Sequence, residues 1–335
     1  MGLNAVEELA SVLYFLFPQA QIADNAPRPA RFLPAMRLLF RLLSRLPLSV
    51  LQHFGALAGW IAYALSARYR QLLQSNLPAD LAGATTGLAV AAETGKGIFE
   101  LPWLWQRSQQ EVVARVLKVD NWSLVEEAWH IGKGIIFLTP HLGCFEITAQ
   151  YYANHRPMTV LYRKPKRAAL APLIEQGRGA NLKLAPADLS GVRNLLKALK
   201  NGEAVGMLPD QVPGSGEGVW VPFFDRPAYT MTLAPRLADT GATVLLAYAE
   251  RLPGGRGYHL KLFPLPEPLA GSPEQKAAQI NRALEGLIRQ CPSQYAWGYN
   301  RYKHPSGAPL PPRWDVCNDG TTPPTPNPPP QGGGY

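Results

Sequence analysis

The residues best suited to chemistry lie in the segment TPHLGCFEI, Thr139 to Ile147. His141 follows a short apolar run, IIFLT, which is bounded by Gly and Pro as buried strands are. Glu146 comes five residues later. On one continuous helix, that spacing places two side chains about 140° apart. The pair can therefore meet only if His141 lies on a loop, which Pro140 and Gly143 favour, and Glu146 lies in the first turn of the next helix.

This arrangement would make the His141 imidazole a general base. The Glu146 carboxylate could accept a hydrogen bond from one ring nitrogen, fix the tautomer and raise the basicity, while the other nitrogen faces the substrate. A lone histidine at a strand end is also common as a purely structural residue. The spacing by itself leaves both interpretations open.

Two other chemistries are weaker alternatives. Cys144 could act as a nucleophile with His141 as its base, although a free cysteine is commonly a small buried hydrophobe. A His/Cys/Glu metal site lacks a second ligand cluster with metal spacing. The glycine-rich GSGEG, Gly214 to Gly218, precedes a strand instead of opening a helix, which argues against a dinucleotide site. The sequence therefore predicts neither a metal nor a cofactor.

Strand and helix patterns alternate along most of the chain. The predicted strands are Val112–Asp120, Ile135–Thr139, Met158–Tyr162, Ala204–Leu208, Val219–Phe224, Val244–Ala249 and Tyr258–Phe263. The predicted helices are Leu88–Trp105, Trp122–Ile131, Ile147–Asn154, Leu170–Arg178, Leu189–Leu199, Met231–Thr240 and Pro273–Gln290. This order predicts an α/β protein with a mixed, largely parallel central sheet covered by helices.

The net charge of +9 is concentrated in two regions. Residues 25–79 contain seven arginines and no acidic residue, and residues 155–183 contain seven basic residues against Glu175 alone. The remainder of the chain is mildly acidic. Such regions suit an anionic partner, whether nucleic acid, an anionic membrane, or an acidic carrier or substrate. Nucleic acid is disfavoured, because the basic residues are mixed with leucines and no groove-reading module is recognisable.

The first basic region is also apolar. Arg37, Arg41 and Arg45 recur every four residues among leucines, which places them in one row of a helix. The next 22 residues, Leu46 to Ala67, are uncharged and long enough to span a bilayer. Pro47, Gln52 and His53 weaken a span, so interfacial helices are the slightly favoured alternative. The third alternative is a core helix of a soluble protein with an exposed row of arginines.

Composition divides the chain into four parts. Residues 1–35 are an N-terminal extension, 36–80 are basic apolar membrane-associated helices, 81–304 are a catalytic domain, and 305–335 are a Pro/Gly-rich tail expected to be disordered. Glu7 and Glu8 occupy the place of a positively charged signal-peptide start. Three scattered cysteines are too few for a disulfide framework, which favours a reducing compartment.

Four stretches together resemble a known family. HLGCFE is similar to an H-x4-[DE] catalytic motif, and VLYRKP to a strand that ends in Tyr-Arg-Pro. MLPDQ with the later VPFFDRPAYT is similar to a Pro-Asp-Gln segment followed by a Val-Pro-Phe-Phe and Ala-x-Thr signature. PSQYAWGYNRYK is similar to a C-terminal Gln-Tyr-x-Trp-x-x-x-Arg-x-Lys ending. In this order, from about Leu33 to Pro309, they resemble the bacterial lipid A biosynthesis (lauroyl/myristoyl) acyltransferases of the lysophospholipid acyltransferase superfamily.

The resemblance implies a glycerolipid acyltransferase-like fold, with His141 as general base and Glu146 as its orienting partner. It further implies that Asp210 and Arg178 are site residues and that Arg163 is a substrate-binding cation. The family often has a second acid two residues after the first, whereas this chain has Val212 there. Donors for the oxyanion would come from backbone N–H groups near Gly143 or from an arginine.

The implied reaction is transfer of an acyl chain from an acyl carrier protein thioester, or from acyl-CoA, to a hydroxyl of an anionic glycolipid at the cytoplasmic face of the bacterial inner membrane. Alternatives are an acyltransferase for another lipid acceptor, such as a phospholipid or ornithine lipid. A membrane-bound esterase and a non-catalytic lipid-binding protein remain further alternatives.

Overall fold

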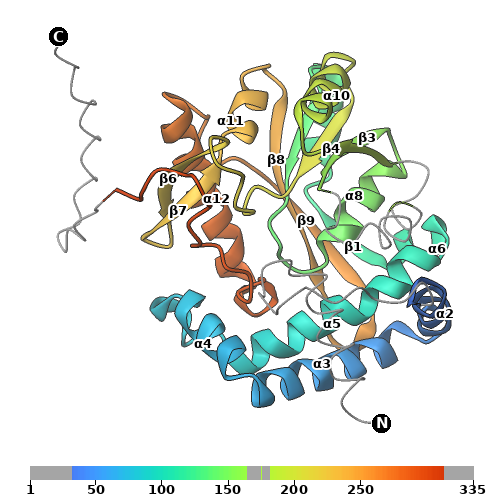
Figure 1. The fold of residues 1–335 in the computed structure, drawn as a ribbon. Coiled ribbons are helices and arrows are strands. Elements are labelled where there is room, and N and C mark those ends of the chain that lie inside the picture. The colour runs from blue at the N-terminus through green and yellow to red at the C-terminus, as the bar shows by residue number, and fades with distance from the viewer. Residues whose placement is uncertain (1–31, 164–174, 176–181, 313–335) are drawn as a thin grey trace.

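A seven-stranded mixed sheet forms the centre of the molecule (Figure 1). The computed structural model describes residues 32–163, 175 and 182–312. The sheet order is β1-β9-β8-β2-β5-β3-β4. The strands of this sheet are β1 (Val116–Asp120), β2 (Ile135–Leu138), β3 (Met158–Tyr162), β4 (Leu182–Pro186), β5 (Ala204–Met207), β8 (Thr243–Arg251) and β9 (Tyr258–Pro264). All neighbouring pairs are parallel except β8 with β9, which confirms the predicted mixed, largely parallel sheet.

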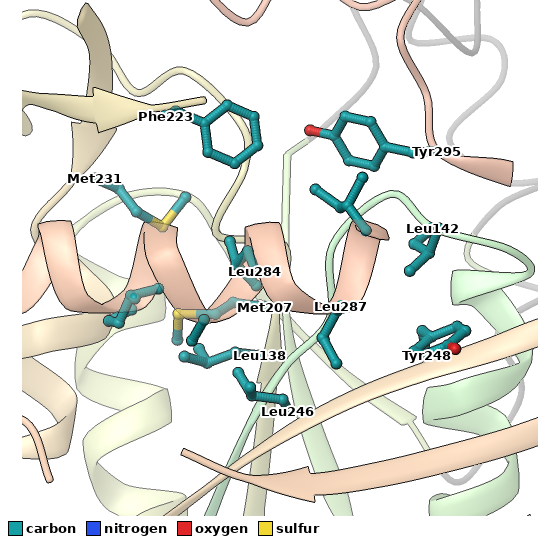
Figure 2. Packing of buried hydrophobic residues seen from close by; sticks show 14 of the residues in the cluster. Leu138, Leu142, Met207, Phe223, Met231, Leu246, Tyr248, Leu284, Leu287 and Tyr295 are labelled. Carbon is teal, nitrogen blue, oxygen red and sulfur yellow. The ribbon is translucent and has the colours of Figure 1, made fainter. Parts of the chain in front are cut away.

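Alternate residues of the central strands face two different layers of helices. Ile136 and Leu138 of β2 belong to a core with α12 (Pro273–Gln290) and α10 (Leu189–Lys200), while α11 (Leu233–Ala238) covers the same face. Figure 2 shows Leu284 and Leu287 of α12 beside Leu138, Met207 and Leu246 of the sheet. Ile135 and Phe137 instead pack against α7 (Ser123–Ile131) and α8 (Phe145–Ala153).

A third layer is built from the N-terminal helices. These are α2 (Phe32–Ser44), α3 (Leu48–Leu65), α4 (Ala67–Asn76) and α5 (Gly87–Gln106), with the short η1 (Ala79–Leu81) between the last two. In Figure 1, α3 and α5 run side by side below the sheet. Their backbones touch at Gly55 and Gly95, where an added Cβ on Gly55 would lie 2.5 Å from the Gly95 carbonyl oxygen. Buried residues of α2, α3 and α5 continue into a core with β9 and α8.

One predicted helix is wrong in its first residues. The segment Met231–Thr240 was expected to be helical, but Met231 ends β7 (Arg226–Met231), and α11 begins at Leu233. β7 pairs antiparallel with β6 (Gly218–Phe223) as a separate two-stranded sheet. The hairpin loop is Phe224-Asp225, with φ of 46° and 56°. A two-residue turn of that kind is usually recognisable as Asn-Gly or Asp-Gly, and neither dipeptide occurs at this hairpin loop.

Other boundaries also differ from the expectation. α6 (Gln109–Val113) occupies the start of the strand predicted from Val112, and β4 was missed because it is a short edge strand that ends in proline. α2 begins at Phe32, before Met36. η3 (Pro253–Gly255) and η4 (Pro292–Gln294) are short 3-10 turns. The helix predicted over 170–178 lies outside the described residues apart from Glu175, which is helical.

The start of the predicted tail lies against the folded protein. Ala308 is buried, and the indole N–H of Trp220 in β6 donates to the carbonyl oxygen of Pro309 at 2.8 Å. Residues 305–312 were assigned to the tail by composition, which does not detect individual contacts of this kind. Residues 313–335 lie outside the described part of the chain.

Candidate active site

The site forms where two neighbouring parallel strands end. His141 follows β2, and Asp210 follows β5, which is paired with β2 in parallel. The Thr139 N–H donates to the Met207 carbonyl oxygen at 3.1 Å, which carries the pairing past the end of β2. Because the carboxyl ends of parallel strands meet at one edge of a sheet, residues 69 positions apart come into contact there.

Asp210 holds His141 by two hydrogen bonds. The backbone N–H of His141 donates to one carboxylate oxygen at 2.9 Å, and Nδ1 lies 2.9 Å from the other. Asp210 is only 1% exposed. Burial alone would raise the pKa of this carboxyl group, but the charge and hydrogen bonds of His141, together with Arg301, outweigh burial and hold that pKa below its ordinary value. Since an ionised carboxylate can only accept, Nδ1 carries the proton, and whenever the ring is neutral Nε2 presents a lone pair.

Two aromatic rings and an amide surround the imidazole. The rings of Phe145 and Tyr299 lie 4.9 and 6.3 Å from that of His141, the second stacked at an interplanar angle of 14°. The side-chain nitrogen of Gln211 lies 3.2 Å from Nε2. The ring is therefore held at Nδ1, on its flanks and at Nε2.

Glu146 occupies the predicted place but makes a different hydrogen bond. It lies in the first turn of α8 and is 7% exposed. The indole N–H of Trp105 donates to its carboxylate at 3.4 Å. Glu146 and His141 line the same pocket, whose apolar wall includes Ile98, Leu101 and Leu104 of α5 and Phe145 of α8. The carboxylate at Nδ1 is that of Asp210, and the orienting role assigned to Glu146 stays a prediction.

Of the two predicted substrate-binding arginines, the structure describes only Arg163. Arg163 is exposed just beyond β3, the strand next to β5. Burial raises the pKa of Tyr299, and the positive charge of Arg163 is among the influences that oppose this rise, so the guanidinium lies near the ring that stacks on His141. Arg178 lies outside the described residues.

Two of the backbone N–H groups near Gly143 already donate to other carbonyl oxygens. Gly143 donates to the carbonyl oxygen of Gln294 at 3.1 Å, and Cys144 donates to that of Ala249 at 2.8 Å. Gly143 has a φ of 60°, and a Cβ there would lie 2.0 Å from the Ala249 oxygen. This glycine therefore allows the loop to approach β8 closely. The N–H groups of Gly143 and Cys144 are not free to bind an oxyanion, and the expectation of donors near Gly143 or from an arginine stays a prediction.

Cys144 is placed as a core residue. It is 3% exposed and belongs to the cluster formed by the N-terminal helices and β9. Burial raises the pKa of its thiol well above the ordinary value, and the nearby Glu100 carboxylate adds to that effect. The nucleophile is the thiolate, so this environment argues against the alternative of cysteine catalysis.

A buried charge network behind the loop was not predicted. Arg251 at the end of β8 donates to both carboxylate oxygens of Glu100, at 2.9 and 2.7 Å, and to Glu93 at 2.9 Å. Its Nη2 also lies 3.3 Å from the carbonyl oxygen of Gly143, and the hydroxyl of Tyr258 donates to Glu100. This network ties α5 to the loop that bears His141. The available signal was the seven-residue spacing of Glu93 and Glu100, which places two acids on one face of a largely apolar helix.

Gln211 and Tyr299 were also missed as neighbours of His141. Both lie inside stretches that carry the family resemblance, MLPDQ and PSQYAWGYNRYK. Their sequence positions gave no indication of which side chains reach the ring, because that depends on how the segments after β5 and α12 meet beside β2.

The fold and this site define an α/β enzyme built around a carboxylate–histidine pair at the carboxyl edge of a largely parallel sheet. The family model of the bacterial lipid A biosynthesis acyltransferases matches residues 30–304. The chain belongs to this family, and it is an acyltransferase.

The chain aligns with curated relatives over most of their length. The chain is 28% identical over 281 residues to the lipid A biosynthesis lauroyltransferase of Escherichia coli (strain K12), covering 80% of this chain and 90% of the relative. It is 26% identical over 305 residues to the lipid A biosynthesis palmitoleoyltransferase of the same organism, covering 86% and 96%. A lipid A biosynthesis acyltransferase of Haemophilus influenzae is 25% identical over 296 residues, covering 79% and 88%.

Proposed function

We propose that this enzyme transfers a fatty acyl chain from an acyl carrier protein thioester to a hydroxyl of a lipid A precursor, with His141 as general base. The observation that carries the proposal is the Asp210–His141 pair, whose tautomer leaves the Nε2 lone pair facing away from the carboxylate. The relatives named as lauroyltransferase and palmitoleoyltransferase support a fatty acyl chain and a lipid A acceptor.

In the proposed reaction, Nε2 of His141 accepts the proton of the acceptor hydroxyl as its oxygen attacks the thioester carbonyl. The tetrahedral intermediate collapses with cleavage of the carbon–sulfur bond. The imidazolium then returns the proton to the departing thiolate. Asp210 keeps Nδ1 protonated throughout and stabilises the positive ring between these two transfers.

The remaining predicted site residues have supporting roles in this proposal. Arg163, exposed near Tyr299, binds an anionic group of the acceptor or of the carrier arm. Arg178 has the same role from the second basic region. Glu146 lies in the pocket wall, where its charge favours the imidazolium that forms during transfer. An acidic acyl carrier protein suits the basic surface, and acyl-CoA is the alternative donor.

The proposed location is the cytoplasmic face of the inner membrane. The described residues contain one helix long and apolar enough to cross a bilayer, Leu48–Leu65. α3 packs against α5 through Gly55 and Gly59, and α5 carries two partners of Arg251, the partly buried Glu93 and the buried Glu100. A spanning α3 would draw this network into the hydrocarbon, so we favour helices that lie in the interface.

Replacement of His141 by alanine tests the catalytic role. With a dodecanoyl thioester of acyl carrier protein and a lipid A precursor, we expect the rate of acyl transfer to fall roughly 10²–10⁴-fold, the usual contribution of a general base. The matched control is His130→Ala, because His130 is exposed at the end of α7. Full transfer by the His141→Ala enzyme would overturn the mechanism. Equal thioester cleavage with and without the acceptor would point to an esterase.

A further inference from the structure

The Nε2 atom of His141 already has a hydrogen-bond partner. Because Asp210 fixes the proton on Nδ1, Nε2 of the neutral ring can only accept. The group 3.2 Å from it is the side-chain nitrogen of Gln211, an amide that donates. Nε2 has a single lone pair, and that lone pair is the one that must take the proton of the acceptor hydroxyl. Gln211 and the hydroxyl therefore compete for one atom.

The two neighbours of the ring differ in how firmly they are held. Asp210 is fully buried, and its carboxylate receives two hydrogen bonds from His141. Gln211 is half-buried, although its backbone is fixed within the same turn. The next residue, Val212, donates its N–H to the hydroxyl of Tyr299 at 2.8 Å, and Tyr299 stacks on His141. The turn therefore has a rigid backbone, an immobile acid, and an amide that can rotate toward solvent.

We propose that Gln211 gates the base: it occupies the Nε2 lone pair until the acceptor hydroxyl displaces it. This inference rests on the proposed function. Such a gate would suppress a side reaction, the hydrolysis of the thioester. In hydrolysis, a water oxygen attacks the thioester carbonyl, His141 passes a water proton to the leaving thiolate, and the products are a fatty acid and a free thiol. A lone pair capped by an amide is not available to that water.

If Gln211 gates the base, its replacement should change how the acyl group is divided between water and the acceptor hydroxyl. Gln211→Met keeps an unbranched side chain of similar length but has no donor, and Gln211→Ala removes the bulk as well. In both variants we expect the ratio of hydrolysis without acceptor to transfer at saturating acceptor to rise about fivefold, the equilibrium factor that one neutral hydrogen bond of typical net strength represents. The KM for the acceptor should fall by a similar factor at unchanged kcat, because the hydroxyl no longer displaces the amide.

The experiment measures thiol release from dodecanoyl acyl carrier protein, with and without the lipid A precursor, and quantifies acylated product in parallel. Gln110→Met, an exposed position on α6, is the control for the substitution itself, and thermal melting checks that each variant is folded. A merely structural role would lower both reactions together and leave their ratio unchanged.

Three results would overturn the gate. The ratio could stay at the wild-type value in Gln211→Met. The ratio could rise only in Gln211→Ala, which would mean that bulk and not the hydrogen bond excludes water. Finally, kcat could fall at constant KM, which would place Gln211 in the chemical step. Failure of the proposed function is distinguishable, because the wild-type enzyme would then not acylate the precursor at all.

Discussion

At the scale of residues, the site depends on which carboxylate reaches the imidazole. Glu146 is five residues from His141 in sequence, whereas Asp210 is 69 residues away, yet Asp210 makes the bond to Nδ1. The Glu146 carboxylate accepts from Trp105, and the side chain lies in the pocket wall. Both acids are buried near the ring, so charge and orientation could be divided between them, with Asp210 orienting the ring and Glu146 contributing charge.

Conservative amides separate these two roles. Asp210→Asn replaces a charged acceptor with a neutral amide, and we expect transfer to fall roughly 10–150-fold, which corresponds to losing one hydrogen bond to a charged group worth about 1.5–3 kcal/mol. Glu146→Gln keeps an oxygen for the Trp105 indole and should cost less. The measurement is kcat/KM for the acceptor in each variant. A large loss in Glu146→Gln with a near-normal Asp210→Asn enzyme would assign the orienting role to Glu146.

The sequence named His141 and both acids as site residues, and it assigned the orienting role to Glu146. Spacing along the chain reports local geometry, and it correctly placed His141 on a loop and Glu146 in the first turn of a helix. Contact between His141 and Asp210 depends instead on β2 and β5 being neighbours in the sheet. The order of strands is a property of the whole fold, so Asp210 entered the prediction only through the family resemblance.

At the scale of elements, α3 and α5 pack with their backbones in contact. A Cβ on Gly59 would lie 2.0 Å from the Ala91 carbonyl oxygen, and one on Gly95 would lie 1.9 Å from that of Gly55. Small residues at such spacing let two helix backbones touch. The sequence predicted both helices but not their contact at GALAG, Gly55 to Gly59, because a helical pattern does not identify its packing partner.

Gly59→Ala tests this contact. The new methyl group must push α3 from α5, and overpacking of this kind typically costs about 1–3 kcal/mol of unfolding free energy. Gly286→Ala is the matched control, because this helical glycine in α12 has nothing within 4 Å of its Cβ position. There the better helix propensity of alanine should stabilise by up to about 1 kcal/mol. Urea unfolding followed by circular dichroism compares the two, and equal effects would contradict the close packing.

At the scale of the whole molecule, the layer of N-terminal helices has two different faces. Leu51, Gly55 and Gly59 of α3 are buried: Leu51 belongs to the core shared with β9, and the two glycines touch α5. The other face of α3, with α2, exposes large apolar side chains, namely Leu38, Leu39, Leu42, Phe54, Leu57, Trp60, Ile61 and Leu65. Three nearby arginines are also exposed: Arg41 on α2, Arg45 in the turn that follows it and Arg68 on α4. An apolar face beside exposed cations is typical of helices that lie in a membrane interface.

Paired serine substitutions test whether this face meets the lipid. Leu57 and Ile61, each about half exposed (50% and 46%), lie one helical turn apart on α3. Changing both to serine should weaken binding to anionic vesicles roughly 30-fold, about 1 kcal/mol for each half-exposed aliphatic side chain that the membrane would cover.

The control changes Leu189 and Leu196 of α10 to serine, because these exposed leucines lie on a helix at the other end of the molecule in Figure 1. Vesicle sedimentation at low and high salt measures the effect, and salt should weaken the arginine contribution in all variants alike. Equal losses from the two pairs would contradict an interfacial α3. Binding that neither salt nor substitution reverses would instead indicate that α3 spans the bilayer, because a spanning helix is held almost irreversibly.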